Sequence, residues 1–275
     1  MTEQIYEHHL KIKNDKFCPF KLGFSGKPFG EVVSNWHKNI EVLLFTEGTA
    51  FIQYGTEDLS VKKDDIVVVN SGVLHRPHSN IDASYAFLII DESFCIENSI
   101  DIENCVFEKK FNDEKTKAHF IKVKKEIESY SKKEEFSGLK LRCAVMNLLI
   151  NLCSDHLVSA NTLNEHQDTS EKYVKTTIEY LNEHFDEEIN LDMLASLCSI
   201  TKFHLSREFK RHTGQTIFTY IITLKCKKAQ VYLSQGMTVT ETALACGFDS
   251  VSYFSQTYKK VMGVSPNNAK KESYK

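Results

Sequence analysis

The sequence contains no apolar run that approaches the roughly 20 residues needed to span a bilayer. Its first residues are polar and of mixed charge, without the basic-then-apolar pattern of a secretory signal peptide. None of the eight cysteines stands in a Cys-x-x-Cys pair, which argues against a zinc ribbon and a thioredoxin-like site. We therefore expect a cytoplasmic protein that has no membrane partner.

Charge is distributed unevenly along a chain whose formal net charge is −3. Residues 171–275 hold 14 Lys and Arg against 11 Asp and Glu, a net of +3, so the remainder carries −6. A basic C-terminal part attached to an acidic N-terminal part is typical of a sensor joined to a DNA-binding domain.

The pattern of apolar residues changes along the chain from strand-like to helix-like. Up to about residue 110, short β-branched or aromatic runs alternate with Gly, Asn and Asp turns, which favours a sandwich or small barrel. From about residue 113, apolar residues recur at steps of three and four, as in helices. We therefore predict a β-barrel over 1–112, a helical segment over 113–158, a polar linker over 159–170 and a helical domain over 171–275.

Two helix-turn-helix patterns follow one another in the C-terminal domain. In the first pattern, the side chain of Asn190 caps one helix and that of Thr201 caps the next. Leu205 and Phe209 form the apolar side of the second helix, and Gly214 ends it. The pattern predicts a short helix, a turn and a helix whose other face is exposed.

The second pattern has the same order of signals. Thr238 and Glu241 form a capping box at the start of one helix, and Gly247 supplies a tight turn. Asp249 or Ser250 then caps the following helix. The stretch between the two patterns predicts one helix of about 19 residues, roughly 28 Å long. That length is close to one turn of B-DNA, 34–36 Å, so two such motifs can reach successive major grooves.

These motifs are similar to those of the AraC/XylS family of bacterial regulators. The similarity covers residues 172–270. Its signatures are L-S-R-x-F-K at Leu205–Lys210, Gly214, Ala229 of the linking helix, G-F-x-x-x-S-Y-F at Gly247–Phe254 and the terminal K-K-x-x-G-x-S-P at Lys259–Pro266. The resemblance implies that the outward face of the second helix of each motif contacts bases, while flanking basic residues hold phosphates.

Transferred by position, the resemblance assigns DNA contacts to both motifs. The predicted residues are Thr201, Lys202, Phe203, Ser206, Arg207, Lys210, Ser250, Val251, Ser252, Ser255, Gln256, Lys259 and Lys260. Two positions depart from the family, because Lys225 stands where Arg is usual in the linking helix and Gln256 stands where many members have Arg. Arg holds guanine bidentately whereas Gln suits adenine, so we expect a second half-site that is A-rich or weakly contacted.

The N-terminal part resembles the two cupin motifs found in the sensor half of many such regulators. His37 and Glu41 are followed by Gly48, and Gly72 and His75 come after an apolar run. In metal-binding cupins, two His of a His-x-His, the Glu and the later His hold one ion. Here the first of these positions is Asn35, the usual glycine is Asp64 and the usual proline is Ser71.

Three interpretations of these residues remain open. His37, Glu41 and His75 ligate a divalent metal in an open site, contact a sugar or another small effector directly, or satisfy one another in a core. We favour direct effector binding without a resident cofactor. The predicted effector-binding residues are Asn35, Trp36, His37, Glu41, His75 and Arg76.

The apolar helical pattern within 113–158 predicts a contact between two copies of the chain, and a purely intramolecular role is the alternative. The predicted dimerisation residues are Leu141, Val145, Leu148, Leu149 and Leu152. The predicted fold class is α+β, with a cupin-like β-barrel followed by helices and then an all-α double helix-turn-helix domain.

The expected function is that of a homodimeric regulator, not an enzyme, that binds specific sequences in double-stranded DNA under the control of a small-molecule effector. We expect an activator, which would act together with RNA polymerase. The alternatives are a metal-dependent cupin enzyme fused to a DNA-binding domain, and a ligand-independent regulator controlled by a protein partner.

Overall fold

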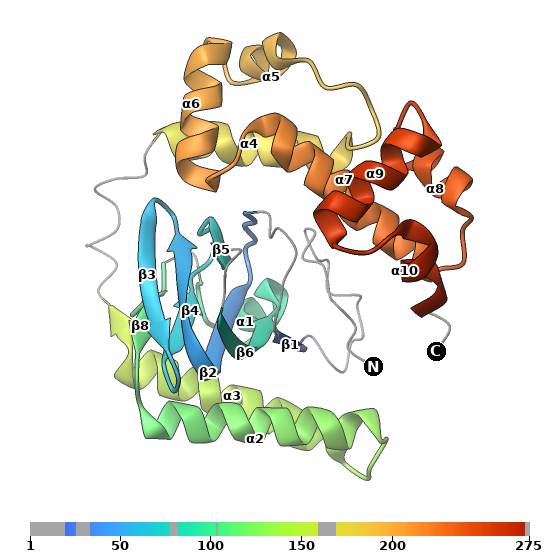
Figure 1. Ribbon diagram of the computed structural model, residues 1–275. Coiled ribbons are helices and arrows are strands. Elements are labelled where there is room, and N and C mark those ends of the chain that lie inside the picture. The colour runs from blue at the N-terminus through green and yellow to red at the C-terminus, as the bar shows by residue number, and fades with distance from the viewer. Residues whose placement is uncertain (1–19, 26–33, 78–81, 103, 159–168, 273–275) are drawn as a thin grey trace. The chain divides into compact units, whose positions relative to one another are not determined.

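The computed structural model describes residues 20–25, 34–77, 82–102, 104–158 and 169–272, which fall into two units (Figure 1). The first unit comprises residues 1–28 and 36–167, and the second comprises residues 29–35 and 168–275. Of the predicted linker, only Thr169 and Ser170 lie within the described residues, and they belong to the first long helix of the second unit. Each unit is described by itself.

An antiparallel sheet curls into a half-barrel in the first unit. Its strands are β1 (Phe20–Ser25), β2 (Ile40–Tyr54), β3 (Glu57–Lys62), β4 (Ile66–Val69), β5 (His75–Pro77), β6 (Asp82–Ile90) and β8 (Lys110–Phe111). They run in the order β1-β6-β2-β4-β8, and β3 and β5 also pair with β2. The smaller elements are α1 (Glu92–Glu97) and the paired strands β7 (Val106–Phe107) and β9 (Leu157–Val158). The predicted class of mixed sheet and helix is confirmed.

The longest strand, β2, contains two apolar runs of the sequence, between which the pattern predicts a turn at Gly48. The strand continues because a β-bulge between Phe45 and Glu47 shifts its register against β6. Gly48 accommodates the resulting bend with a φ of 72°, a conformation that glycine adopts without strain. Before the bulge β2 pairs with β4, and beyond it with β3 and β5. The predicted turn is therefore a bend inside one strand, which connects four neighbours.

Two long helices, α2 (Glu114–Ser131) and α3 (Ser137–Asp155), pack against one face of this sheet. Ile40, Val42 and Leu44 of β2 lie in the shared apolar core. That core also contains the predicted dimerisation residues Leu141, Val145, Leu148, Leu149 and Leu152, all 0% exposed. The five side chains cover the sheet of their own chain, which favours the purely intramolecular alternative.

Helices make up the second unit (Figure 1). They are α4 (Thr169–Glu183), α5 (Leu191–Leu197), α6 (Lys202–Thr213), α7 (Ile217–Ser234), α8 (Val239–Ala245), α9 (Val251–Met262) and α10 (Pro266–Glu272). The pairs α5–α6 and α8–α9 are the two helix-turn-helix motifs, and both pack on α7. Among the described helices of either unit, none is both long enough and apolar enough to cross a membrane.

Side-chain caps begin the short helices as the sequence predicts. The side chains of Asn190, Thr201 and Ser250 accept hydrogen bonds from the first turns of α5, α6 and α9. Thr238 and Glu241 form the predicted capping box at the start of α8. These caps satisfy backbone N–H groups that have no partner within the helix, so each motif begins its helices at defined residues.

Candidate DNA-recognition helices and a buried histidine–glutamate cluster

Helix α6 carries the first predicted recognition surface. Leu205 and Phe209 are fully buried, and Phe209 packs edge-to-face on Tyr220 of α7 with ring centroids 5.4 Å apart. The helix ends at Gly214, whose φ of 69° is in the left-handed region. The predicted contacts on the other side are exposed or half-buried, namely Thr201, Lys202, Phe203, Ser206, Arg207 and Lys210. Phe203, at 80% exposure, stands almost free in solvent.

Arg207 is held by a hydrogen-bond network along α6. Its Nε donates to Glu208 Oε1 at 3.1 Å, and its Nη2 lies 3.0 Å from His204 Nδ1. Glu208 Oε2 accepts a second hydrogen bond from Arg211 Nε at 2.7 Å. Burial raises the pKa of Glu208, but the two guanidinium groups outweigh burial and hold this pKa below its usual range. Glu208 is therefore ionised at neutral pH and orients Arg207.

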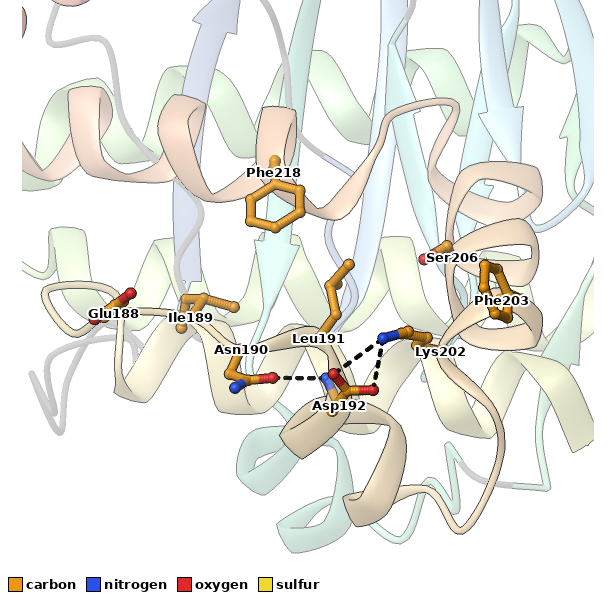
Figure 2. Close-up of a pocket in the computed structure, with 9 residues that line it drawn as sticks. All are labelled: Glu188, Ile189, Asn190, Leu191, Asp192, Lys202, Phe203, Ser206 and Phe218. Atoms are coloured by element: carbon orange, nitrogen blue, oxygen red, sulfur yellow. Dashed lines mark hydrogen bonds and ion pairs between the residues drawn. The ribbon is translucent and has the colours of Figure 1, made fainter.

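A hollow of about 450 Å³ borders the start of α6 (Figure 2). It is lined by Glu188, Ile189, Asn190, Leu191, Asp192, Lys202, Phe203, Ser206 and Phe218. Lys202 Nζ lies 3.0 Å from Asp192 Oδ1 and donates to Oδ2 at 3.1 Å, as the dashed lines in Figure 2 show. One of the predicted DNA-contacting lysines is therefore already paired with a carboxylate of α5.

Helix α9 carries the second predicted recognition surface. Phe254 and Tyr258 are 0% exposed and lie in an apolar core with residues of α7. The helix runs from its cap at Ser250 to Gly263, whose φ of 77° is again left-handed. The predicted contacts Val251, Ser252, Gln256, Lys259 and Lys260 are exposed, and Ser255 is half-buried. The first half of α9 thus offers no charged side chain, in contrast to α6.

Lys225 and Gly247 fix the turn of the second motif. Lys225 Nζ donates to the carbonyl oxygen of Gly247 at 2.7 Å and lies 5.7 Å from the centroid of the Phe248 ring. Burial lowers the pKa of Lys225. A Cβ atom on Gly247 would lie 1.9 Å from the carbonyl oxygen of Asp186, so only glycine fits. Lys225, where the family usually has Arg, therefore supports the second motif from within the domain.

His37, Glu41 and His75 meet inside the first unit, with exposed fractions of 6%, 3% and 5%. Glu41 Oε2 lies 3.3 Å from His37 Nε2 and 3.1 Å from His75 Nε2. Burial raises the pKa of Glu41, but the two imidazoles outweigh burial and lower this pKa to about 2. Because side chains alternate along a strand, Glu41 faces away from Val42 and Leu44, and hence away from α2 and α3.

The other predicted effector-binding residues are arranged differently. Arg76 directly follows His75 in β5, so its side chain points to the opposite face, where its Nε donates to Gln53 Oε1 at 2.8 Å. Asn35 is buried and groups with the second unit, whereas Trp36 is half-buried and groups with the first. The structure brings three of the six predicted residues into one cluster.

The sequence did not single out Asp192 and Glu208, the carboxylates that pair with Lys202 and Arg207. Glu208 lies three residues before Arg211, so the spacing of acidic and basic residues on one helix offered a signal. Asp192 and Lys202 lie on different helices, and no spacing rule connects them. Only the tertiary structure reveals the pair of Asp192 and Lys202.

Comparisons with known proteins agree with this architecture. Residues 194–272 match a family model described as a helix-turn-helix domain. The chain is 22% identical over 259 residues to the uncharacterized HTH-type transcriptional regulator YdeC of Bacillus subtilis strain 168, covering 88% of this chain and 87% of that protein. It is 36% identical over 89 residues to the MmsAB operon regulatory protein of Pseudomonas aeruginosa, covering 32% of this chain and 29% of that protein.

A solved structure supports the fold over nearly the whole length. The apo form of a ToxT variant from Vibrio cholerae strain SCE256 matches 92% of this chain and 97% of its own, with a TM-score of 0.50 and 14% identity. Two capped motifs around α7, together with the family match, define the class of helix-turn-helix transcription regulators. Within that class, residues 194–272 form a helix-turn-helix domain of the AraC type, as the sequence motifs predict.

Proposed function

We propose that the chain binds its operator through two successive major grooves, with α6 in one groove and α9 in the next. The observation that carries this proposal is that each helix buries one apolar side in the second unit and exposes its predicted DNA-contacting side. The 18 residues of α7 correspond to a length of about 27 Å, close to the 34–36 Å of one DNA turn. Both motifs pack on this helix, which supports a defined distance between them.

The two recognition helices are proposed to contribute unequally to sequence specificity. Arg207 of α6 presents a guanidinium group, which can hold guanine through two hydrogen bonds. Gln256 of α9 is exposed and suits adenine. We therefore assign a guanine contact to the first half-site and an A-rich sequence to the second.

The substitution Arg207→Ala tests the contact of α6 with DNA. Operators are selected from random duplexes with the full chain, and affinities are measured by fluorescence anisotropy at several salt concentrations. A base contact predicts a loss of about 1–3 kcal/mol that relaxes specificity at one position, whereas a phosphate contact predicts a uniform loss and a salt slope lower by about one. Lys125→Ala, on an exposed part of α2, serves as the control. Failure of the full chain to prefer any selected duplex over a scrambled one would contradict the proposed function.

The half-barrel is proposed as the domain that binds a small-molecule effector, a sugar or a small acid. Support comes from the cluster of His37, Glu41 and His75, since polar groups are rarely buried together without a binding or structural role. An effector that binds one arrangement of the chain more tightly shifts the population toward it and so changes DNA affinity. A thermal-shift screen of sugars and small acids finds candidates, and operator titrations test them. A screen whose ligands all leave operator affinity unchanged argues against effector control.

A further inference from the structure

The first turn of α4 contacts the proposed recognition helix α6 at two places. Ser170 Oγ accepts a hydrogen bond from Arg211 Nη2 at 2.7 Å. Three residues further along α4, the ring of Tyr173 meets the ring of His204 edge-on, with centroids 6.2 Å apart. Residues three apart lie on the same face of a helix, so Ser170 and Tyr173 belong to one surface of α4 that faces α6. All four residues belong to the second unit.

The hydrogen bonds around Ser170 define its role. Arg211 Nη2 also lies 3.2 Å from His212 Nε2, and Ser170 Oγ lies 3.0 Å from the same nitrogen. A guanidinium group only donates hydrogen bonds, so Nε2 of His212 keeps its lone pair and accepts. The Ser170 hydroxyl group therefore accepts from Arg211 and donates to His212. With exposed fractions of 7% and 1%, Ser170 and His212 are shielded from solvent. Loss of this hydroxyl group would remove one of the contacts that hold Arg211.

Each contact with α4 leads to one side of the Arg207 guanidinium group. On one side, Arg211 Nε donates to Glu208 Oε2 at 2.7 Å, and Oε1 of the same carboxylate accepts from Arg207 Nε at 3.1 Å. On the other side, Arg207 Nη2 donates to His204 Nδ1 at 3.0 Å. The side chain of Arg207 is 71% exposed. Hydrogen bonds rather than packing therefore determine where its guanidinium group points.

We propose that Ser170 and Tyr173 of α4 are positioning residues for DNA recognition. They hold Arg211 and His204 in place, and through these side chains they set the direction of the Arg207 guanidinium group. The inference rests on the proposed base contact of Arg207. A guanine contact through two hydrogen bonds requires one orientation of this planar group. Greater freedom of the group therefore lowers the preference for guanine, whereas contacts with phosphates, which carry no sequence information, are retained.

Ser170→Ala tests the inference in the full chain, with operators selected from random duplexes. Guanine preference is the ratio of the affinities for guanine and for another base at the position that Arg207→Ala relaxes. We expect Ser170→Ala to lower this ratio about 2- to 10-fold, the usual cost of immobilising one long side chain on binding. The affinity for scrambled DNA and the salt slope should stay unchanged. In the Arg207→Ala background, Ser170→Ala should have no further effect, because Ser170 acts through Arg207.

Two further substitutions and one control complete the series. Arg211→Lys keeps the charge but loses the planar fork that joins Glu208 to Ser170, so it should lower the ratio as well. Tyr173→Leu, at the second contact, should act in the same direction. Ser234→Ala is the control, because this exposed hydroxyl group donates only to the carbonyl oxygen of Val231 in its own helix, at 2.7 Å.

The results that overturn the inference follow from the same series. They are an unchanged ratio in both Ser170→Ala and Arg211→Lys, or an effect of Ser170→Ala that persists in full without Arg207. The side chain of Arg211 is 46% exposed, so Arg211→Lys keeps the test decisive even where Ser170→Ala fails to fold.

A measurement without DNA separates the inference from the proposed function. The NMR signal of the Arg207 Nε–H group is assigned by its loss in Arg207→Ala. In Ser170→Ala or Arg211→Lys this signal should shift and exchange with water faster than in the wild type, since local order is lost. An unchanged signal refutes the positioning role whatever the DNA result. A changed signal in a chain that prefers no selected duplex over a scrambled one refutes the proposed function alone.

Discussion

Two of the positive charges expected to contact DNA have carboxylate partners before DNA binds. Lys202 pairs with Asp192, whose side chain is 71% exposed, and Arg207 pairs with Glu208, whose side chain is 8% exposed. An exposed carboxylate competes with a phosphate for the same lysine. A buried carboxylate instead fixes the direction of the guanidinium group while leaving its outer edge accessible. The two pairs are therefore expected to influence DNA affinity in different ways.

Asp192→Asn is expected to raise DNA affinity with little change in stability. The substitution frees Lys202 and removes a negative charge beside α6, so the salt dependence of log K should steepen by about one. The exposed pair contributes at most about 1 kcal/mol to the free energy of unfolding. Anisotropy titrations over a range of salt concentrations measure the first effect, and urea unfolding measures the second. Glu128→Gln, an equal charge change on α2, is the control, and unchanged affinity in Asp192→Asn would place Lys202 outside the DNA interface.

Glu208→Gln is expected to make stability less dependent on pH. The pKa of Glu208 is lowered in the folded chain from its usual 4.5, so its ion pairs stabilise the fold above that pH and are lost as the pH falls below it. Near pH 7 the wild type should be more stable than the variant by about 1 kcal/mol. Urea unfolding of both chains near pH 7 and near pH 3 checks this expectation. A difference that stays constant between the two pH values would show that the ionised carboxylate is not the cause.

At the scale of single elements, the helices of the second unit follow from the sequence because helix ends are determined locally. Asn190, Thr201 and Thr238 cap helices through bonds to backbone two or three residues away, so their spacing alone predicts them. The linking helix has 18 residues where about 19 are predicted. For α9, the sequence left Asp249 and Ser250 open, and the structure selects Ser250.

The elements of the first unit are less predictable, because strand pairing depends on distant residues. The glycine at position 48 predicts a turn between two strands. Only the fold shows that β6 pairs with β2 on both sides of a bulge, so that the chain continues as one strand. The apolar stripe of α3 predicts burial but does not distinguish the chain's own sheet from a second chain. Arg76 follows His75 in sequence, and the alternation of β5 separates their side chains. In each case the local pattern does not contain the distant residues that decide which side chains or strands meet.

Gly247→Ala is expected to destabilise the second helix-turn-helix motif strongly. A φ of 64° costs about 1–3 kcal/mol for a residue with a side chain, and the clash with the backbone of Asp186 adds to this cost. Gly263→Ala is the matched control, because φ is 77° there but a Cβ atom meets nothing within 4 Å. Thermal and urea unfolding compare the two variants. Equal destabilisation would show that the close approach of Asp186 does not constrain this turn.

At the scale of the whole molecule, both proposed recognition helices pack on α7, which predicts a fixed distance between the two half-sites. Inserting five base pairs between the half-sites turns one of them by about half a helical turn, since B-DNA has 10–10.5 base pairs per turn. The affinity should then fall to that of a single half-site. Anisotropy titrations with this operator and with one that carries the insertion outside both half-sites measure the effect. Equal affinities for the two duplexes would show that the motifs bind DNA independently.

The candidate sites were predictable to different degrees, because some of their features depend on local sequence and others on residues far apart in the chain. The exposed faces of α6 and α9 follow from periodicity and capping, which are local. His37, Glu41 and His75 were recognised as a possible set by their motifs, but the backbone carbonyl groups beside the two ring Nδ1 atoms are positioned only by the fold. Spacing thus predicted which side chains could meet, and the structure showed which atoms face one another.

Helix α7 contributes to the apolar core beneath both motifs. Tyr220 near its start packs on Phe209 of α6, and Ala229 and Leu233 near its end lie in the core that includes Phe254 of α9. A break anywhere within this helix would leave each half with an uncovered apolar surface. The two motifs consequently share one core helix, and we expect that exchanging either motif alone would leave an apolar side of α7 uncovered.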